Sequence, residues 1–311
     1  QKNYRKKNDK IIEVGSNDGT FLLNFLKKKY NVLGFEPSLN VANIARKKGL
    51  KVISKFFNYK NISKNQKFKK RINLICAANV ICHIPDLKNL IKSIDFSLSK
   101  DGLFIFEEPY LGSMFKKVSY DQIYDAHVFI FSLHSVKSIF NSFGFDLINA
   151  VPQKTHGGSM RYVIARKNIY EVNKRVKYLL KKEKLNKLNK ISSCIKFKKQ
   201  CEESRRKFRL KIKNFKKRGK IICGYAASAK STTALNYCGI DHNYIDYVVD
   251  STKEKIGKFT PGTHIPIKSP KYFRNNYPDI AILNSWNHKN EILKKEFMFK
   301  RKGGKWISHV K

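Results

Sequence analysis

The sequence predicts an α/β fold made of two doubly wound units joined by a helical connector. Between residues 10 and 110, short apolar runs alternate with amphipathic stretches, and the same alternation restarts at Lys220. Each half also begins with a strand, a glycine-containing turn and a helix, followed by a second strand that ends on an acid, Glu36 or Asp250. We therefore expect two Rossmann-like lobes.

The first lobe is expected to cover residues 1–166, with its elements following one another in the order strand, helix, strand. Apolar runs predict strands over 10–14, 31–36, 51–54, 72–77 and 103–107. Helical spacing predicts helices over 20–29, 39–48 and 86–98. Residues 110–131 lack clean periodicity, which indicates an irregular insertion of the kind that holds substrate contacts in α/β enzymes. A helix over 135–143 and strands over 145–151 and 159–166 complete this lobe.

The connector, residues 167–219, has a distinct composition. The stretch 167–220 holds 22 Lys and Arg residues against four Glu, and its apolar residues recur at helical spacing. This pattern predicts one or two long helices. The second lobe, 220–311, is expected to contain strands over 221–225, 244–250, 280–283 and 306–307, with helices over 228–238 and 289–300.

The chain of 311 residues carries a formal net charge of +42, which by itself suggests a nucleic acid or membrane partner. However, only 12 of the 65 basic residues are arginine, the residue suited to bidentate recognition of bases and phosphates. The excess is spread along the chain and is densest in the connector. We therefore expect mostly solvated lysine-rich helices, with a local positive field that helps to attract a substrate carrying a diphosphate.

The six cysteines show no C-x-x-C pair and no zinc-finger spacing, so we expect no metal site. Most of them lie in apolar runs, as buried reduced thiols of a cytoplasmic protein do. No apolar stretch approaches the roughly 20 residues that cross a bilayer, and no signal peptide precedes the first strand. The expected location is the cytoplasm, with no membrane partner.

A cofactor site is predicted where the first strand ends, in the run EVGSNDGT (13–20). Its glycines allow close approach to the backbone, but it is not the G-x-G-x-x-G of dinucleotide binding, because Asn17 replaces the middle glycine. Glu13 and Asp18 suit a cationic group, and Glu36, at the end of the second strand, can accept from ribose hydroxyls. Together they indicate S-adenosylmethionine. The alternative is a plain tight turn with a solvated acid.

Several further motifs resemble one known family along nearly the whole chain. They are EVGSNDGT, NVICHIPDL (79–87), EEPYL (107–111), DQIYDAH (121–127), HGGSMR (156–161), GYAASAK (224–230), NYCGI (236–240) and KFTPGTHIPI (258–267). In this order they resemble the S-adenosylmethionine-dependent C-methyltransferases that act on nucleotide-linked deoxysugars. The combination of HGGSMR and TPGTHIPI in one chain is the most specific part of the resemblance.

The resemblance implies a class I methyltransferase fold for the first lobe and a nucleotide-sugar site that includes the second lobe. Its S-adenosylmethionine residues fall on Glu13, Gly15, Asn17, Asp18, Gly19, Glu36 and Asn79, the last on the methyl-donor side. Its catalytic residues fall on Tyr124 and His127. Its substrate residues fall on Glu108, His156, Gly157, Ser159, Arg161, Tyr225 and Lys230.

The chemistry of C-methylation agrees with the roles of Tyr124 and His127. An unactivated C–H bond is not nucleophilic, so a neighbouring keto group must allow formation of an enolate. An imidazole titrates near neutral pH and suits removal of the α-proton. On a helical turn Tyr124 would share a face with His127 and hold the enolate oxygen. The alternative for His127, and more strongly for His83 and His156, is a structural histidine. For Lys230 a close-packed turn is an equal alternative to a phosphate contact.

Two departures from the family pattern affect the expected activity. The family has an acid directly before the catalytic histidine, where this chain has Ala126, so that any role of the acid is lost or passes to Asp125 or Glu108. The family also has a cysteine-rich zinc module before the first strand, where this sequence has about ten residues. We expect a fragment of a longer chain, or a short form without zinc.

Other functions remain open from the sequence. They are methylation of another small keto acceptor, binding or methylation of nucleic acid, and a non-catalytic scaffold. The charge favours nucleic acid, but no stacking-aromatic motif supports it, so no nucleic-acid partner is expected. The expected partner is a small nucleotide sugar, and the expected assembly is a monomer or weak oligomer.

Overall fold

The computed structural model describes residues 9–310. Its contacts divide the chain into two units. Unit 1 contains residues 9–111, 128–154 and 158–189, and unit 2 contains residues 112–127, 155–157 and 190–310. The segment around Tyr124 and His127, which is predicted to be catalytic, therefore packs with the C-terminal half of the chain.

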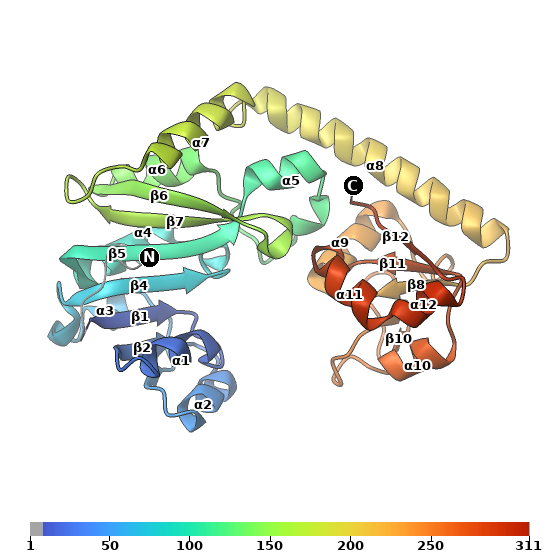
Figure 1. The fold of residues 1–311 in the computed structure, drawn as a ribbon, viewed down its shortest axis with the longest axis horizontal. Coiled ribbons are helices and arrows are strands. Elements are labelled where there is room, and N and C mark those ends of the chain that lie inside the picture. Colours follow the sequence, from blue (N-terminus) through green and yellow to red (C-terminus); the bar gives the residue numbers. More distant parts are fainter. Residues whose placement is uncertain (1–8, 311) are drawn as a thin grey trace. The chain divides into compact units, whose positions relative to one another are not determined.

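Unit 1 is built on a seven-stranded sheet in the order β3-β2-β1-β4-β5-β7-β6 (Figure 1). The strands are β1 (Lys10–Val14), β2 (Asn31–Phe35), β3 (Val52–Ile53), β4 (Ile72–Ala78), β5 (Leu98–Pro109), β6 (Phe145–Gln153) and β7 (Ser159–Arg166). The first five are parallel, and β7 runs antiparallel to both β5 and β6. The order reverses between β1 and β4, and in such sheets ligands bind beyond the carboxyl ends of the strands at this point.

Helices cover both faces of this sheet because successive side chains of a strand point to opposite faces. Ile11 packs with Leu22 of α1 and Ala42 of α2, whereas Ile12 packs with Leu90 of α4 and Val136 of α6. All six residues are buried. The helices of unit 1 are α1 (Thr20–Leu26), α2 (Leu39–Lys47), α3 (Tyr59–Ile62), α4 (Leu87–Ser97), α6 (Leu133–Asn141) and α7 (Lys174–Leu185), with 3₁₀ helices η2 (Gln66–Phe68) and η3 (Ile81–His83).

Unit 2 has a second, all-parallel sheet in the order β10-β9-β8-β11-β12 (Figure 1). Its strands are β8 (Ile222–Tyr225), β9 (Tyr247–Val249), β10 (Ile267–Lys268), β11 (Ile280–Leu283) and β12 (Lys305–Ile307). Its helices are α5 (Leu111–Lys117, all but its first residue), α8 (Ile191–Lys217), α9 (Ala229–Cys238), α10 (Pro270–Asn275), α11 (Lys289–Lys295) and α12 (Phe297–Arg301), with 3₁₀ helices η4 (Tyr120–Gln122), η5 (Thr155–Gly157) and η6 (Trp286–His288). Phe273 and Phe299 are fully buried in the core on one face of this sheet.

The predicted fold class is confirmed, and the differences are local. The stretch 110–131, predicted to be irregular, contains the helix α5 and the 3₁₀ helix η4. The single helix predicted over 289–300 is two helices, interrupted at Glu296. The Glu296 carboxylate is buried and binds Tyr225 and Arg274, which holds the backbone there at φ −110° and ψ 38°. Within residues 9–310, no helix is long and apolar enough to cross a membrane.

Candidate active site

The turn between β1 and α1 is held against the end of β2 by backbone hydrogen bonds. The amides of Gly15 and Ser16 both donate to the carbonyl of Phe35, at 2.8 and 3.0 Å. Gly15 has φ +66°, and a Cβ there would lie 2.5 Å from Cγ2 of Val80. Because this position combines a left-handed conformation with close packing, only glycine fits without a shift of Val80.

Glu36 connects this turn to the next one. Its Oε2 accepts from the amide of Asn17 at 3.0 Å, and its Oε1 accepts from the amide of Ser38 at 2.9 Å. Asn17 itself has φ +49°, a conformation that asparagine tolerates better than most residues. These two backbone amides thus hold the carboxylate of Glu36, which is predicted to accept from the ribose hydroxyls, in place.

Glu13 is a buried acid of the site. Its side chain is at the end of β1, the residue is 5% exposed, and its Oε2 has no hydrogen-bond partner among the described residues. Burial, together with the nearby carboxylates of Asp18 and Glu36, raises the pKa of Glu13 to about 8. At neutral pH this acid is therefore mostly protonated, and a cation bound beside it would favour its ionised form.

Asp18 has a different environment from Glu13. Its Oδ2 lies 2.6 Å from Nζ of Lys48, and its Oδ1 accepts from the amide of Thr20. These hydrogen bonds, with that from Lys48 the largest contribution, lower the pKa of Asp18 to about 2. Gly19, at φ +79°, then begins α1. Because Lys48 already compensates Asp18, Glu13 is the acid of this turn to which no described residue offers an ion pair.

Asn79 and Glu108 lie at the ends of β4 and β5. Asn79 has φ +55°, its amide donates to the carbonyl of Glu107 at 2.9 Å, and its buried Oδ1 has no partner within residues 9–310. Glu108 is 0% exposed, and its Oε1 accepts from the amides of Val80 and Ile81 at 2.9 and 2.6 Å. Glu108 therefore fixes the loop that carries Asn79, and its predicted substrate contact stays a prediction.

These residues fit S-adenosylmethionine. The cofactor carries an ammonium and a sulfonium, and the site offers the unpaired buried oxygens of Glu13 and Asn79. Its ribose hydroxyls suit the carboxylate of Glu36. Gly15 leaves the space that a Cβ would fill. All four features belong to unit 1 and lie at the carboxyl ends of β1, β2 and β4, on either side of the point where its sheet order reverses.

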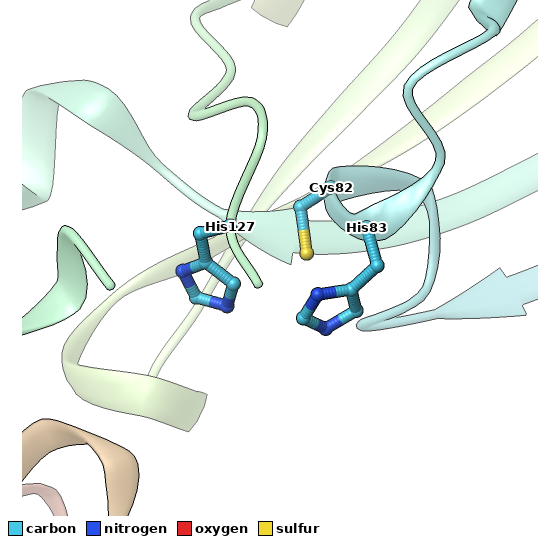
Figure 2. A group of neighbouring side chains, drawn as sticks. All are labelled: Cys82, His83 and His127. Atoms are coloured by element: carbon cyan, nitrogen blue, oxygen red, sulfur yellow. The ribbon is translucent and has the colours of Figure 1, made fainter. Parts of the chain in front are cut away.

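The predicted catalytic residues are in contact with each other in unit 2. The phenol oxygen of Tyr124 lies 2.6 Å from Nε2 of His127, and Nδ1 of His127 lies 2.9 Å from the carbonyl oxygen of Gln122. Because a carbonyl only accepts, the Nδ1 atom carries the hydrogen, and Nε2 of the neutral ring accepts from the phenol. Figure 2 shows the His127 ring, with Cys82 and His83 from η3 of unit 1.

The residues that hold this segment were not predicted. Asp121 is 0% exposed, and its Oδ2 accepts from Nε1 of Trp286 at 2.7 Å. Its Oδ1 lies 3.4 Å from Nε2 of His309, whose side chain is 1% exposed. These contacts join residues 165 and 188 positions apart in sequence, so no spacing motif could have revealed them.

The HGG turn also packs against Trp286. His156 has φ +50°, and a Cβ on Gly157 would lie 1.9 Å from the Trp286 ring. The carbonyl of Gly157 accepts from Nζ of Lys117 at 2.5 Å. The ammonium groups of Lys117 and Lys230 lie 5.4 and 5.5 Å from the centroid of the same indole. Two predicted substrate residues, Gly157 and Lys230, therefore share one aromatic neighbour.

Three other predicted substrate residues have structural partners. Arg161 on β7 donates from Nε and Nη2 to Oε2 of Glu107, at 3.1 and 2.8 Å. Ser159, also on β7, is buried. Tyr225 is 8% exposed in the core of unit 2, where its hydroxyl donates to Glu296 at 2.8 Å. Their contacts with substrate stay predictions.

Comparison with known proteins places the two halves in known families. Residues 154–310 match the model of the C-methyltransferase C-terminal domain, and residues 2–150 match a methyltransferase domain. The chain is 30% identical to the C-methyltransferase NovU of Streptomyces niveus over 96% of this chain and 71% of that protein. It is 34% identical to the carboxy-S-adenosyl-L-methionine synthase of Nautilia profundicola over 40% of this chain and 55% of that protein.

Among solved structures, a SAM-dependent methyltransferase from Archaeoglobus fulgidus matches 53% of this chain and 88% of its own, with 14% identity and a TM-score of 0.43. The C-terminal family match covers half of the chain, and the similarity to NovU extends through both units. The chain therefore belongs to the C-methyltransferase family and is an S-adenosylmethionine-dependent C-methyltransferase.

Proposed function

We propose that this enzyme methylates a carbon next to the keto group of a nucleotide-linked deoxysugar, through an enolate, with His127 as the general base. The observation that carries this proposal is the contact between Tyr124 and His127 in a C-methyltransferase. A carbon acceptor needs a base, whereas most heteroatom acceptors already have a lone pair. The motif HGGSMR (156–161), which resembles the sugar-methylating family, supports the choice of substrate class.

The tautomer of His127 determines which of its two nitrogens can take up the proton in the proposed reaction. The hydrogen on Nδ1 is held by the carbonyl of Gln122, so Nε2 can receive one proton. The α-C–H bond breaks, its proton goes to Nε2, and the electron pair forms the enolate. The phenol of Tyr124 is placed to exchange its hydrogen bond from Nε2 to the enolate oxygen. Bound S-adenosylmethionine supplies the electrophilic methyl group, after which the ketone is restored.

A group of cations in unit 2 supports a diphosphate-bearing substrate. Nζ of Lys230 is buried without a hydrogen-bond partner among the described residues, and burial lowers its pKa. Lys230 is the second residue of α9, where free backbone amides also attract anions. Lys117 reaches the same indole. A phosphate would relieve the cost of the unpaired Lys230 ammonium, which an uncharged keto acceptor would not do.

The proposal is tested by incubating the protein with S-adenosylmethionine and a panel of nucleotide-linked 4-keto sugars, followed by mass spectrometry. We expect one sugar to gain the mass of one CH2. His127→Asn should abolish this product while leaving cofactor binding intact. Lys230→Met should weaken binding of the nucleotide sugar, and Lys253→Met, at an exposed lysine of the same unit, should not. Methylation of a free keto acid with no product across the panel would instead identify another keto acceptor.

A further inference from the structure

The C-terminal residues of unit 2 end close to the catalytic segment. After β12 the chain places the His309 ring 5.2 Å from the ring of Tyr120 and 5.9 Å from that of Phe208 on α8. The carbonyl of His309 accepts from Oγ of Ser204 at 3.3 Å, also on α8. The ring is thus fixed on both sides, and its Nε2 faces Oδ1 of Asp121.

Asp121 of η4 contacts side chains from other parts of unit 2. Its carboxylate has the Trp286 indole on one oxygen and His309 on the other. The neighbouring Tyr120 adds a contact between its hydroxyl and Sγ of Cys238, at 3.4 Å. Among the described residues Oδ2 is hydrogen-bonded to Trp286, whereas Oδ1 has no hydrogen bond and only lies 3.4 Å from Nε2 of His309. A fully buried carboxylate is costly unless polar groups lie against it, so both contacts favour one position of η4.

The position of η4 determines the state of His127. Gln122 directly follows Asp121, and its carbonyl is the acceptor for Nδ1 of His127. If η4 shifts, this carbonyl moves, and the imidazole loses the hydrogen bond that selects its tautomer. A displacement of 1 Å at a catalytic group can cost roughly 100-fold in rate.

We propose that His309 is a positioning residue that acts through Asp121 and Gln122 to hold His127 in its Nδ1-protonated tautomer. The proposal rests on the proposed role of His127 in catalysis, but its structural part does not. His309 follows β12, the last strand of unit 2. It therefore supports a segment that lies almost two hundred positions earlier in the sequence.

The test uses the full chain with ¹⁵N-labelled histidine and long-range ¹H–¹⁵N NMR, in which the two imidazole nitrogens report the tautomer directly. The His127 signals are assigned with His127→Asn. In the wild type we expect a protonated Nδ1 and an unprotonated Nε2. In His309→Leu, which fills the space but removes the polar contact with Asp121, we expect a mixture of tautomers. His242→Leu, the same change at an exposed histidine of unit 2, is the matched control and should leave the signals unchanged.

Activity provides the second measurement. We expect kcat of His309→Leu to fall about 10- to 100-fold, with an unchanged dissociation constant for S-adenosylmethionine, and His309→Gln to recover part of the loss. Unchanged His127 signals in a folded His309→Leu protein would overturn the inference, whether or not the enzyme is active. A tautomer change without any methylated product from the wild type would retain the positioning role and refute the proposed function.

Discussion

The hydroxyl of Tyr124 and Nε2 of His127 are 2.6 Å apart, so a hydrogen bond joins the two side chains. If the phenol of Tyr124 donates to a substrate oxygen instead, Nε2 of His127 loses this hydrogen bond. If Nε2 takes up a proton, it can no longer accept from the phenol. In the proposed reaction the two groups therefore act as a pair. A turn, and not a helix, brings them together, since the amide of His127 donates to the carbonyl of Tyr124 at 2.8 Å.

Substitutions in this pair should not be additive. We expect His127→Asn and Tyr124→Phe each to lower kcat by about 100- to 10,000-fold, the usual contribution of general acid–base catalysis. The double variant should be no slower than the slower single variant, because each change disables the same unit. Single-turnover methylation rates provide the measurement, with cofactor affinity as a control for folding. Losses that multiply would show that the residues act independently.

Binding of S-adenosylmethionine should depend on pH through Glu13. Below its raised pKa of about 8, Glu13 is mostly protonated, and a bound ammonium favours the ionised form. Binding therefore releases a proton, and affinity should rise with pH between 6 and 8 by at most about tenfold per unit. The ratio of the wild-type and Glu13→Gln dissociation constants, measured by calorimetry, removes the titration of the cofactor itself. A ratio that is constant with pH would contradict the assignment.

The same group makes a prediction for stability. The folded protein keeps the Glu13 proton up to about pH 8, whereas the unfolded chain releases it near 4.5. The unfolded state thus binds fewer protons in this interval, and the stability of unit 1 should fall as pH rises through it. Glu13→Gln should remove this slope in urea unfolding followed by circular dichroism. Asp18→Asn is the control, because Asp18, with a pKa of about 2, is ionised throughout the interval.

Local sequence patterns were sufficient to predict most of the fold. β1 begins and ends where predicted, because Ile11 and Ile12 are buried on opposite faces and apolar residues dominate this strand. The pattern was insufficient at α5, whose sequence LGSMFKK is too short to show a helical period. It also failed at Glu296, where a buried side chain, and not a helix-breaking residue, interrupts the helix.

The residues of the site also fall into two groups, those that a local sequence pattern predicts and those that it does not. Glu13, Glu36 and the turn between them could be predicted, since a strand end, a glycine turn and a second strand end recur at fixed places in this fold. The partners of Asp121 could not, because Trp286 and His309 reach it only through tertiary packing. Glu183 was also missed. A glutamate in a lysine-rich helix is expected to be exposed to solvent. Glu183 is nevertheless buried, and its carboxylate accepts from the hydroxyl of Tyr110 and from the first amides of α6.

Glu108 should affect cofactor affinity without touching the cofactor. Glu108→Ala leaves the buried amides of Val80 and Ile81 without an acceptor, which should cost about 1–3 kcal/mol of stability per unpaired group. It should also weaken S-adenosylmethionine binding, because the loop carries Asn79. Glu108→Gln keeps an acceptor oxygen and should be much milder. Equal affinities for wild type and Glu108→Ala would show that Asn79 is held by other contacts.

Gly157 and Gly257 provide a matched pair that isolates the packing of the HGG turn against Trp286. Both have nearly the same positive φ, +82° and +83°, so alanine should strain each by a similar amount, about 1 kcal/mol. A Cβ at Gly257 meets nothing within 4 Å, whereas at Gly157 it would lie 1.9 Å from the indole. Overpacking should therefore add about 1–3 kcal/mol for Gly157→Ala alone.

Tryptophan fluorescence suits this comparison, since both tryptophans of the chain, Trp286 and Trp306, belong to unit 2. The denaturant midpoint of Gly157→Ala should be lower than that of Gly257→Ala. Because Trp286 also donates to Asp121, relief of the clash by movement of the indole would disturb η4. In that case Gly157→Ala should lower kcat as well. Equal midpoints and equal kcat for the two variants would show that neither the HGG turn nor the catalytic segment depends on the position of this ring.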